Sequence, residues 1–250
     1  MSESAATLYG EDLAYIQAEG FGGMAEAAAP EIVALLRERG IATGTIGDIG
    51  CGAGVSTRCF LEAGYGVWAL EPSRALLELA RAAARGAEFL PPASLYDTEL
   101  LPADALVALG EPLTYHDPGS DADTRVLDFF SRAAAVLGAG GLLVFDVIVR
   151  GEPSLDARSW RAGEDWAVLV ETRGDASSGW LRREIQTFRR IGEGGADYRR
   201  GRETHHVRLF DADALAAALR ERGFEVETAR AYGRYDLATR RLAYICSRRG

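Results

Sequence analysis

The residues of this sequence that most clearly suggest a chemical role are an acidic residue and the three glycines that follow it at alternate positions. Asp48 comes at the end of a short apolar run, and Gly50, Gly52 and Gly54 follow it. From Val55 the apolar residues recur at helical spacing. A strand, a tight turn and a helix start are therefore expected. Such a turn lets a ligand approach the backbone and meet free N–H groups.

The glycine spacing separates two classes of cofactor. A dinucleotide fingerprint, Gly-x-Gly-x-x-Gly, needs a third glycine where this chain has Val55. The pattern Asp-x-Gly-x-Gly-x-Gly instead resembles motif I of the class I S-adenosylmethionine (SAM)-dependent methyltransferases. A glycine-rich turn that binds no ligand is the alternative, so the neighbouring segments must decide.

A second acidic residue follows the next predicted strand. Residues 66–70 are apolar and lead into Glu71, which stands 21 residues after Gly50. A carboxylate at the carboxyl end of this strand can accept hydrogen bonds from both ribose hydroxyls of an adenosine cofactor. Alternatively, Glu71 is a surface residue before a helix capped by Ser73, where negative charge is also favourable.

Two further loops lie where parallel strands of such a sheet would end. The first contains Ser94 and Leu95, and the resemblance places it beside the adenine ring. The second follows a continuous apolar run at 105–109 and begins with Gly110 and Glu111. Strand ends form the binding crevice of these sheets, so this second loop should face the cofactor, and the resemblance implies that it lines the methionine side.

A helical cover is predicted for residues 1–44, ahead of the glycine turn. A short helix from about Glu11 is expected to break at residues 20–23, and Pro30 suits the first turn of a second helix. Residues 9–24 would then lie over a ligand, although simple packing onto the body explains them equally well.

The predicted cofactor-binding residues come from the glycine turn, the strand ends and the cover. The resemblance implies that Asp48 lies near the amino group of SAM, directly or through water. Tyr9 and Tyr15 would be aromatic residues of the cover. The complete set is Tyr9, Tyr15, Asp48, Gly50, Cys51, Gly52, Glu71, Pro72, Ser94, Leu95, Gly110 and Glu111.

Strands and helices alternate up to residue 149, which predicts an α/β fold with a doubly wound, Rossmann-like sheet. The resemblance implies seven strands. Residues 150–210 contain three predicted strands without helices, and antiparallel insertions of this kind commonly shape substrate pockets. A single domain over 1–250 is expected, with a helical cover (1–44), a cofactor-binding core (45–149 and 211–248) and a substrate-side antiparallel insertion (150–210).

Composition limits the possible partners. A net charge of -9 argues against non-specific nucleic-acid binding, which depends on many basic residues. No apolar run approaches the roughly 20 residues of a membrane span, and the N-terminus lacks signal-peptide features, so a cytoplasmic protein is expected. The three cysteines and three histidines show no metal-ligand spacing, and no metal is predicted. A homodimer is left open.

Methyl transfer needs a general base only when the nucleophile must lose a proton, and the candidates here are Tyr115, His116 and His205. His116 follows a core strand, and its ordinary pKa suits base catalysis, although it also fits an exposed loop. Tyr115 would orient the substrate or simply pack. Strand alternation places Glu203 and His205 on one face, as a polar pair toward substrate or as a structural ion pair.

The resemblance therefore implies a SAM-dependent methyltransferase that acts on an oxygen or nitrogen atom of a small-molecule acceptor. An NAD(P)-dependent oxidoreductase is the enzymatic alternative, and Val55 counts against it. A non-catalytic module that keeps the fold and binds a cofactor or partner is the alternative from another class.

Overall fold

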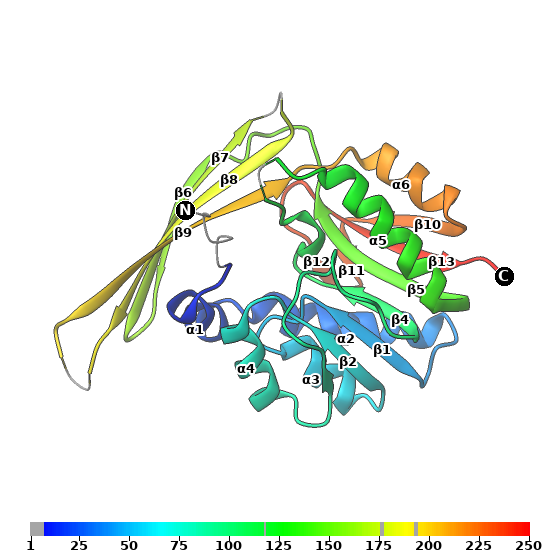
Figure 1. The fold of residues 1–250 in the computed structure, drawn as a ribbon, viewed down its shortest axis with the longest axis horizontal. Coiled ribbons are helices and arrows are strands. Elements are labelled where there is room, and N and C mark those ends of the chain that lie inside the picture. The colour runs from blue at the N-terminus through cyan, green and yellow to red at the C-terminus, as the bar shows by residue number, and fades with distance from the viewer. Residues whose placement is uncertain (1–7, 118, 176–177, 193–194) are drawn as a thin grey trace.

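A computed structural model describes residues 8–117, 119–175, 178–192 and 195–250 of the chain. Its centre is a seven-stranded sheet of order β10-β13-β5-β4-β1-β2-β3 (Figure 1). Only β13, within the described ranges, runs against its neighbours β5 and β10. The strands are β1 (Thr45–Ile49), β2 (Gly66–Leu70), β3 (Glu88–Phe89), β4 (Ala103–Ala108), β5 (Leu137–Ile148), β10 (Phe224–Ala229) and β13 (Arg241–Arg248). The predicted doubly wound, seven-stranded α/β sheet is thereby confirmed.

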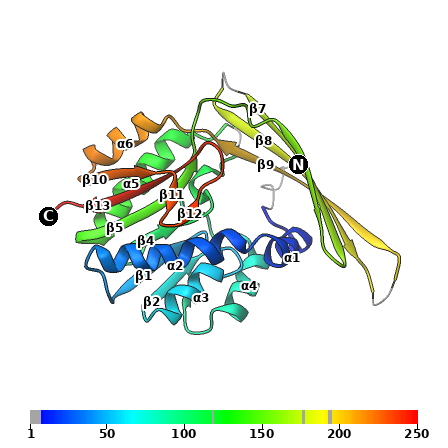
Figure 2. The same cartoon turned by 180° about the vertical axis from the view of Figure 1, so that it is seen from behind.

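Helices cover both faces of this sheet, and each face has its own apolar core (Figures 1 and 2). On one face, α5 (Ala122–Val136) and α6 (Ala212–Glu221) pack against the sheet. On the other, α2 (Gly23–Glu38) and α3 (Val55–Glu62) do so. Because the central strands are covered on both faces, their residues are mostly apolar, apart from the buried Asp48 and Asp146. The helices on both faces thus hold the carboxyl ends of the parallel strands in place at one edge of the sheet.

The start of α2 differs from the prediction. The break after α1 (Glu11–Gly20) lies at Phe21 and Gly22, as expected, but α2 begins immediately at Gly23 and contains Pro30 in its interior. A proline removes one hydrogen bond from a helix interior and is unfavourable there. Burial of Ala28, Ala29 and Ile32 against the sheet outweighs that cost. The prediction that the helix begins at Pro30 is therefore wrong.

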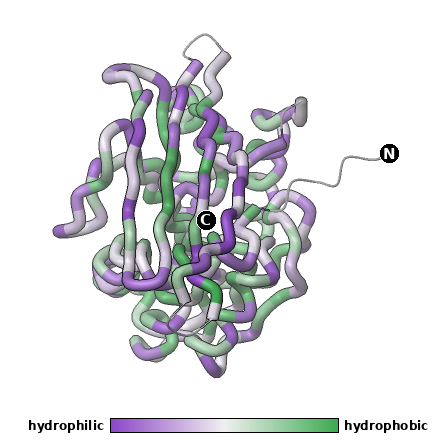
Figure 3. Tube along the Cα trace, turned by 90° about the vertical axis from the view of Figure 1, so that its left-hand side faces the viewer, coloured by the Kyte–Doolittle hydropathy of each residue, from purple (hydrophilic) through white to green (hydrophobic). Residues whose placement is uncertain are grey.

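The insertion is a separate antiparallel sheet of four strands, in the order β6-β7-β8-β9. Three of them were predicted: β7 (Trp166–Asp175), β8 (Trp180–Arg190) and β9 (Tyr198–Arg208). The additional strand, β6 (Ala157–Ala162), is exposed along its whole length and so has no alternation to reveal it. Figure 3 shows hydrophilic and hydrophobic segments mixed along the insertion, as expected for a sheet covered on one face.

Helix α1 fills the space between the insertion and the body. Leu13 and Ile16 are buried against Trp166, Val168 and Ile185 of the insertion. A small hairpin of β11 (Ala231–Tyr232) and β12 (Tyr235–Asp236) lies in the chain between β10 and β13. Among the residues that the structure describes, none of the helices has the length and apolar character needed to cross a bilayer.

Candidate functional site

A cavity of about 1450 Å³ lies beside the carboxyl ends of the parallel strands. Ligand pockets commonly measure about 300–1,000 Å³, so this one has room for a cofactor and a second molecule. Most of the predicted site residues line it, namely Tyr9, Gly50, Cys51, Gly52, Glu71, Pro72, Ser94, Leu95, Gly110, Tyr115 and His116. The other four, Tyr15, Asp48, Glu111 and His205, are not among its lining residues.

The glycine turn has the geometry that only glycine adopts readily. Gly50, Gly52 and Gly54 have φ angles of 70°, 56° and 84°, all in the left-handed region. A Cβ on Gly54 would lie 2.8 Å from the Cα of Ala80 on α4 (Arg74–Ala83), so a side chain is excluded there. A Cβ on Gly52 would meet only open space, which shows that its backbone faces the cavity.

Glu71 presents a carboxylate to the cavity from the end of β2. Its Oε2 accepts a 3.0 Å hydrogen bond from the Gly52 N–H, and its Oε1 a 2.9 Å bond from the Ser73 N–H. Each carboxylate oxygen keeps a further lone pair for a ligand hydroxyl. Burial raises the pKa of Glu71 to about 7, although both backbone bonds act in the opposite direction.

Asp48 supports the turn from inside the protein. It is 1% exposed and accepts hydrogen bonds from Ser56 Oγ at 2.8 Å and Thr57 Oγ1 at 2.6 Å. Burial raises its pKa to about 6. The carboxylate therefore holds the first turn of α3 beneath the cavity wall. A role beside the amino group of SAM stays a prediction.

Tyr115 and His116 are positioned by the insertion. The short 3₁₀ helix η1 (Pro112–Thr114) follows β4, and Tyr115 then forms a bridge with Val207 of β9. The His116 N–H donates to the His206 carbonyl at 3.3 Å. The insertion is thus bonded directly to the loop that follows β4, opposite the glycine turn.

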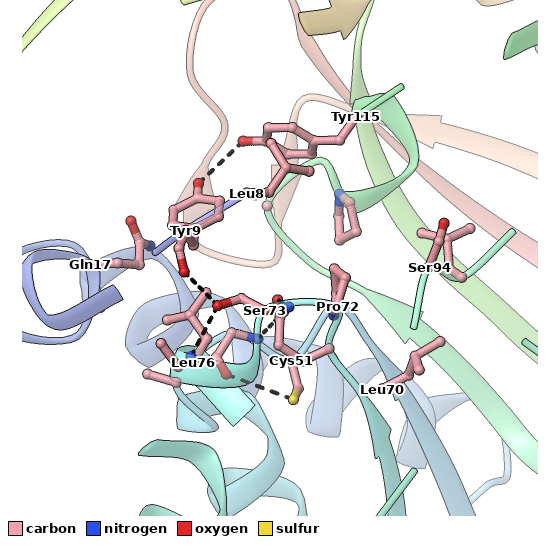
Figure 4. Close-up of a pocket in the computed structure, with 18 of the residues that line it drawn as sticks. Leu8, Tyr9, Gln17, Cys51, Leu70, Pro72, Ser73, Leu76, Ser94 and Tyr115 are labelled. Carbon is pink, nitrogen blue, oxygen red and sulfur yellow. Dashed lines mark hydrogen bonds between the residues drawn. The ribbon is translucent and has the colours of Figure 1, made fainter. Parts of the chain in front are cut away.

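Two tyrosine hydroxyl groups lie close together at the part of the cavity that borders the insertion. Tyr9 Oη lies 3.3 Å from Tyr115 Oη, and Figure 4 shows the two side chains pointing at each other. Arg183, on β8, donates a 3.2 Å hydrogen bond to the Tyr115 hydroxyl. The pair is therefore oriented by a cation that stands behind it.

Glu111 points away from the cavity into a buried ionic cluster. Its carboxylate lies 2.5 Å from Arg183 Nη1 and 3.0 Å from Arg241 Nη2. Arg241 Nε also lies 3.4 Å from Asp146 Oδ2, and Asp146 Oδ1 accepts a 2.8 Å bond from the Gly110 N–H. Burial alone would raise the pKa of Glu111, but the two guanidinium groups outweigh it and lower the pKa. The predicted contact of this side chain with the methionine part of SAM has no support in this orientation.

The two predicted histidines occupy different environments. His116 lines the cavity, stacks on Tyr96 at 4.6 Å and lies with Nε2 3.1 Å from the Leu113 carbonyl, to which it donates. Burial lowers its pKa to about 4. His205 is 1% exposed, and its Nε2 lies 2.9 Å from Glu203 Oε2. Its ring packs behind Tyr9 and Tyr115, so it supports these residues from outside the cavity.

Tyr15 faces the insertion. Its hydroxyl donates to Asp165 at 3.1 Å, and the guanidinium group of Arg189 lies 3.8 Å from its ring centroid. Several cavity residues were not predicted, including Arg125, Asp117, Thr204 and His206. The alternation of β9 separates His205 from His206, but sequence gives no sign of which one faces the cavity. Within the described ranges, no group of three His, Cys, Asp or Glu side chains is arranged to hold a metal ion.

The raised pKa of Glu71 predicts a measurable pH dependence of stability. The folded protein keeps a proton on Glu71 up to about pH 7, whereas the unfolded chain releases it near 4.5. The contribution of Glu71 to stability is therefore full below pH 4.5 and is lost as the pH rises to 7. Glu71→Gln removes this titration. Between pH 4.5 and pH 7, the free energy of unfolding of the variant minus that of wild type should therefore increase by about 3 kcal/mol. Urea unfolding of both proteins at several pH values measures the difference; a constant difference would contradict the assignment.

Comparison with known proteins adds structural neighbours. No protein-family model matches the sequence, and no curated protein matches it either. A SAM-dependent methyltransferase from Clostridium acetobutylicum superposes with a TM-score of 0.77 at 16% identity, over 95% of this chain and 98% of that one.

Two further structural neighbours are methyltransferases of sugars. A sugar N-methyltransferase from Streptoalloteichus has a TM-score of 0.77 at 22% identity, over 100% and 99% of the two chains. A SAM-bound amino pentose methyltransferase from Micromonospora echinaspora has a TM-score of 0.75 at 19% identity, over 98% and 100%. The insertion and the N-terminal helices are included in these matches. The chain therefore shares its fold with these SAM-dependent methyltransferases.

Proposed function

We propose that this protein is a SAM-dependent methyltransferase that acts on a nitrogen atom of a small polar molecule. The observation that carries the proposal is the Glu71 carboxylate, presented to a large cavity beside a left-handed glycine turn. This arrangement fits an adenosine cofactor, because the carboxylate has lone pairs for two hydroxyls and the turn has accessible backbone. The fold shared with SAM-dependent methyltransferases supports the same cofactor.

The residues around the cavity divide into two halves. In the cofactor half, Glu71 would hold the ribose of SAM, and the backbone of Gly50 to Gly52 would hold its methionine part. Ser94 and Leu95 would contact the adenine ring. Bound SAM supplies a methyl group on a positively charged sulfur, which is already reactive toward a nucleophile. The protein's own task is to hold the acceptor in line and exclude water, which can lower a barrier by about 7–11 kcal/mol.

Nitrogen is favoured over oxygen because the cavity histidines are weak proton acceptors. Burial lowers the pKa of His116 to about 4 and also lowers the pKa of His206. An alcohol must lose a proton to attack, which requires an effective base, whereas a neutral amine attacks through its lone pair. Two of the structural neighbours, a sugar N-methyltransferase and an amino pentose methyltransferase, agree with this choice.

Tyr9 and Tyr115 are the residues that we assign to the acceptor amine. Their hydroxyl oxygens can accept hydrogen bonds from the amine N–H groups, which leaves the lone pair free to attack. Arg183 donates to the Tyr115 hydroxyl and so limits its rotation. The role is one of orientation, and neither hydroxyl needs to take up a proton.

Cofactor binding tests the first part of the proposal. Calorimetry should detect SAM and its demethylated product with micromolar dissociation constants. Above pH 7, where Glu71 is ionised, Glu71→Ala should weaken SAM binding by at least about tenfold, since a hydrogen bond to a charged group is worth about 1.5–3 kcal/mol. The matched control, Glu88→Ala, removes a solvent-exposed carboxylate from β3 and should bind as wild type does. Binding of NADH in place of SAM would favour the oxidoreductase alternative.

The acceptor role of Tyr115 gives a second prediction. Tyr115→Phe keeps the ring and the Arg183–Glu111 pair but removes the oriented hydroxyl. We expect kcat/KM for the acceptor to fall by about tenfold to a hundredfold with little change in the SAM dissociation constant. Tyr65→Phe, which loses a buried bond to the Ile41 carbonyl, is the control for losing a tyrosine hydroxyl elsewhere. Equal activity in Tyr115→Phe and wild type would remove the residue from the site.

A further inference from the structure

Residues 8–10, called the strap below, lie along the cavity just before α1, and all three line it. Ser73 Oγ donates a 2.6 Å hydrogen bond to the carbonyl oxygen of Tyr9 (Figure 4). Since Ser73 stands two residues after Glu71, this bond fastens one side of the strap to the cofactor half of the cavity.

One carboxylate from the insertion holds the other side of the strap. Glu203, on β9, accepts a 2.8 Å hydrogen bond from the Tyr9 N–H and a 2.9 Å bond from the Gly10 N–H. Gly10 is the N-cap residue just before α1 and makes no side-chain hydrogen bond that caps the helix. Because free N–H groups at a helix start attract negative charge, Glu203 caps α1 from a distant part of the chain.

The two anchors together set the direction of the Tyr9 side chain. Tyr9 has a φ of 53°, a conformation that residues other than glycine adopt at a cost. Its N–H is held by Glu203 and its carbonyl by Ser73. Its ring lies 5.0 Å from the ring of His205, which is itself bonded to Glu203. Loss of the Glu203 anchor would free the backbone that directs Tyr9 toward Tyr115.

We propose that Glu203 is a positioning residue that couples the acceptor side of the cavity to the strap and thereby places the Tyr9 hydroxyl. This inference rests on the proposed function. The next residue, Thr204, and His206 line the cavity from the same strand. Contact between an acceptor and β9 is therefore transmitted to the strap through Glu203, which itself stands behind the site and does not touch the acceptor.

The test compares Glu203→Gln and Glu203→Asp with wild type. Glutamine keeps the length but loses the charge and one acceptor, and aspartate keeps the charge but is one methylene too short to reach both amides. The control, Glu184→Gln, removes a carboxylate on the neighbouring strand β8 that pairs with Arg182 and Arg202 on the other face of the sheet.

Two readouts separate positioning from folding. The first is kcat/KM for an amine acceptor, which both Glu203 variants should lower by about tenfold or more, with SAM dissociating faster. The second is hydrogen–deuterium exchange over residues 8–20, which should be about tenfold faster in both variants and unchanged in the control. Exchange elsewhere in the core should match wild type.

Wild-type exchange in the strap and wild-type kcat/KM in both Glu203 variants would overturn the inference. Slower turnover with unchanged exchange would also overturn it, because the strap would then not depend on Glu203. If the wild-type protein binds no SAM, the proposed function fails, and the exchange measurement still decides whether Glu203 holds the strap.

Discussion

The ion pairs of the buried Glu111 carboxylate are the interactions on which the half of the cavity that we assign to the acceptor depends. A carboxylate that is 2% exposed is stable as an ion only beside compensating charges. Those charges come from Arg183 in the insertion and Arg241 at the start of β13, so three distant parts of the chain must meet at the end of β4. Removing one partner would leave a buried charge unpaired, which costs about 3–5 kcal/mol in known cases. The cluster thereby fixes the insertion against the core.

That junction explains how the insertion, a sheet separate from the core, can shape a precise site. Tyr115 follows Glu111 by four residues and is bonded to both Arg183 and β9. Tyr9 belongs to the N-terminal part of the chain, and hydrogen bonds of its backbone with Glu203 and Ser73 hold it beside Tyr115. The cofactor half does not depend on such contacts between distant segments, because the glycine turn and Glu71 follow adjacent parallel strands of the core.

This division also explains how far sequence alone could predict the site. The left-handed turn, the acid after β2 and the Ser73 cap are local patterns, and local backbone rules suffice to predict them. The side-chain direction of Glu111 depends on Arg183 and Arg241, which lie 72 and 130 residues further along the chain. No spacing rule distinguishes Arg183 from the other arginines of the insertion. The interior position of Pro30 and the exposed strand β6 escape prediction for the same reason, since tertiary packing and strand pairing decide both.

The proposed transfer of a methyl group from SAM to an amine can be followed with an isotopic label. The protein is incubated with SAM carrying a deuterated methyl group and with matched pairs of amino sugars and the corresponding hydroxy sugars, and the products are analysed by mass spectrometry. We expect the labelled methyl group on the nitrogen of amino members of the panel and on none of the hydroxy members. Labelling of hydroxy members alone, or no labelling of any amine by protein that binds SAM, would contradict the account.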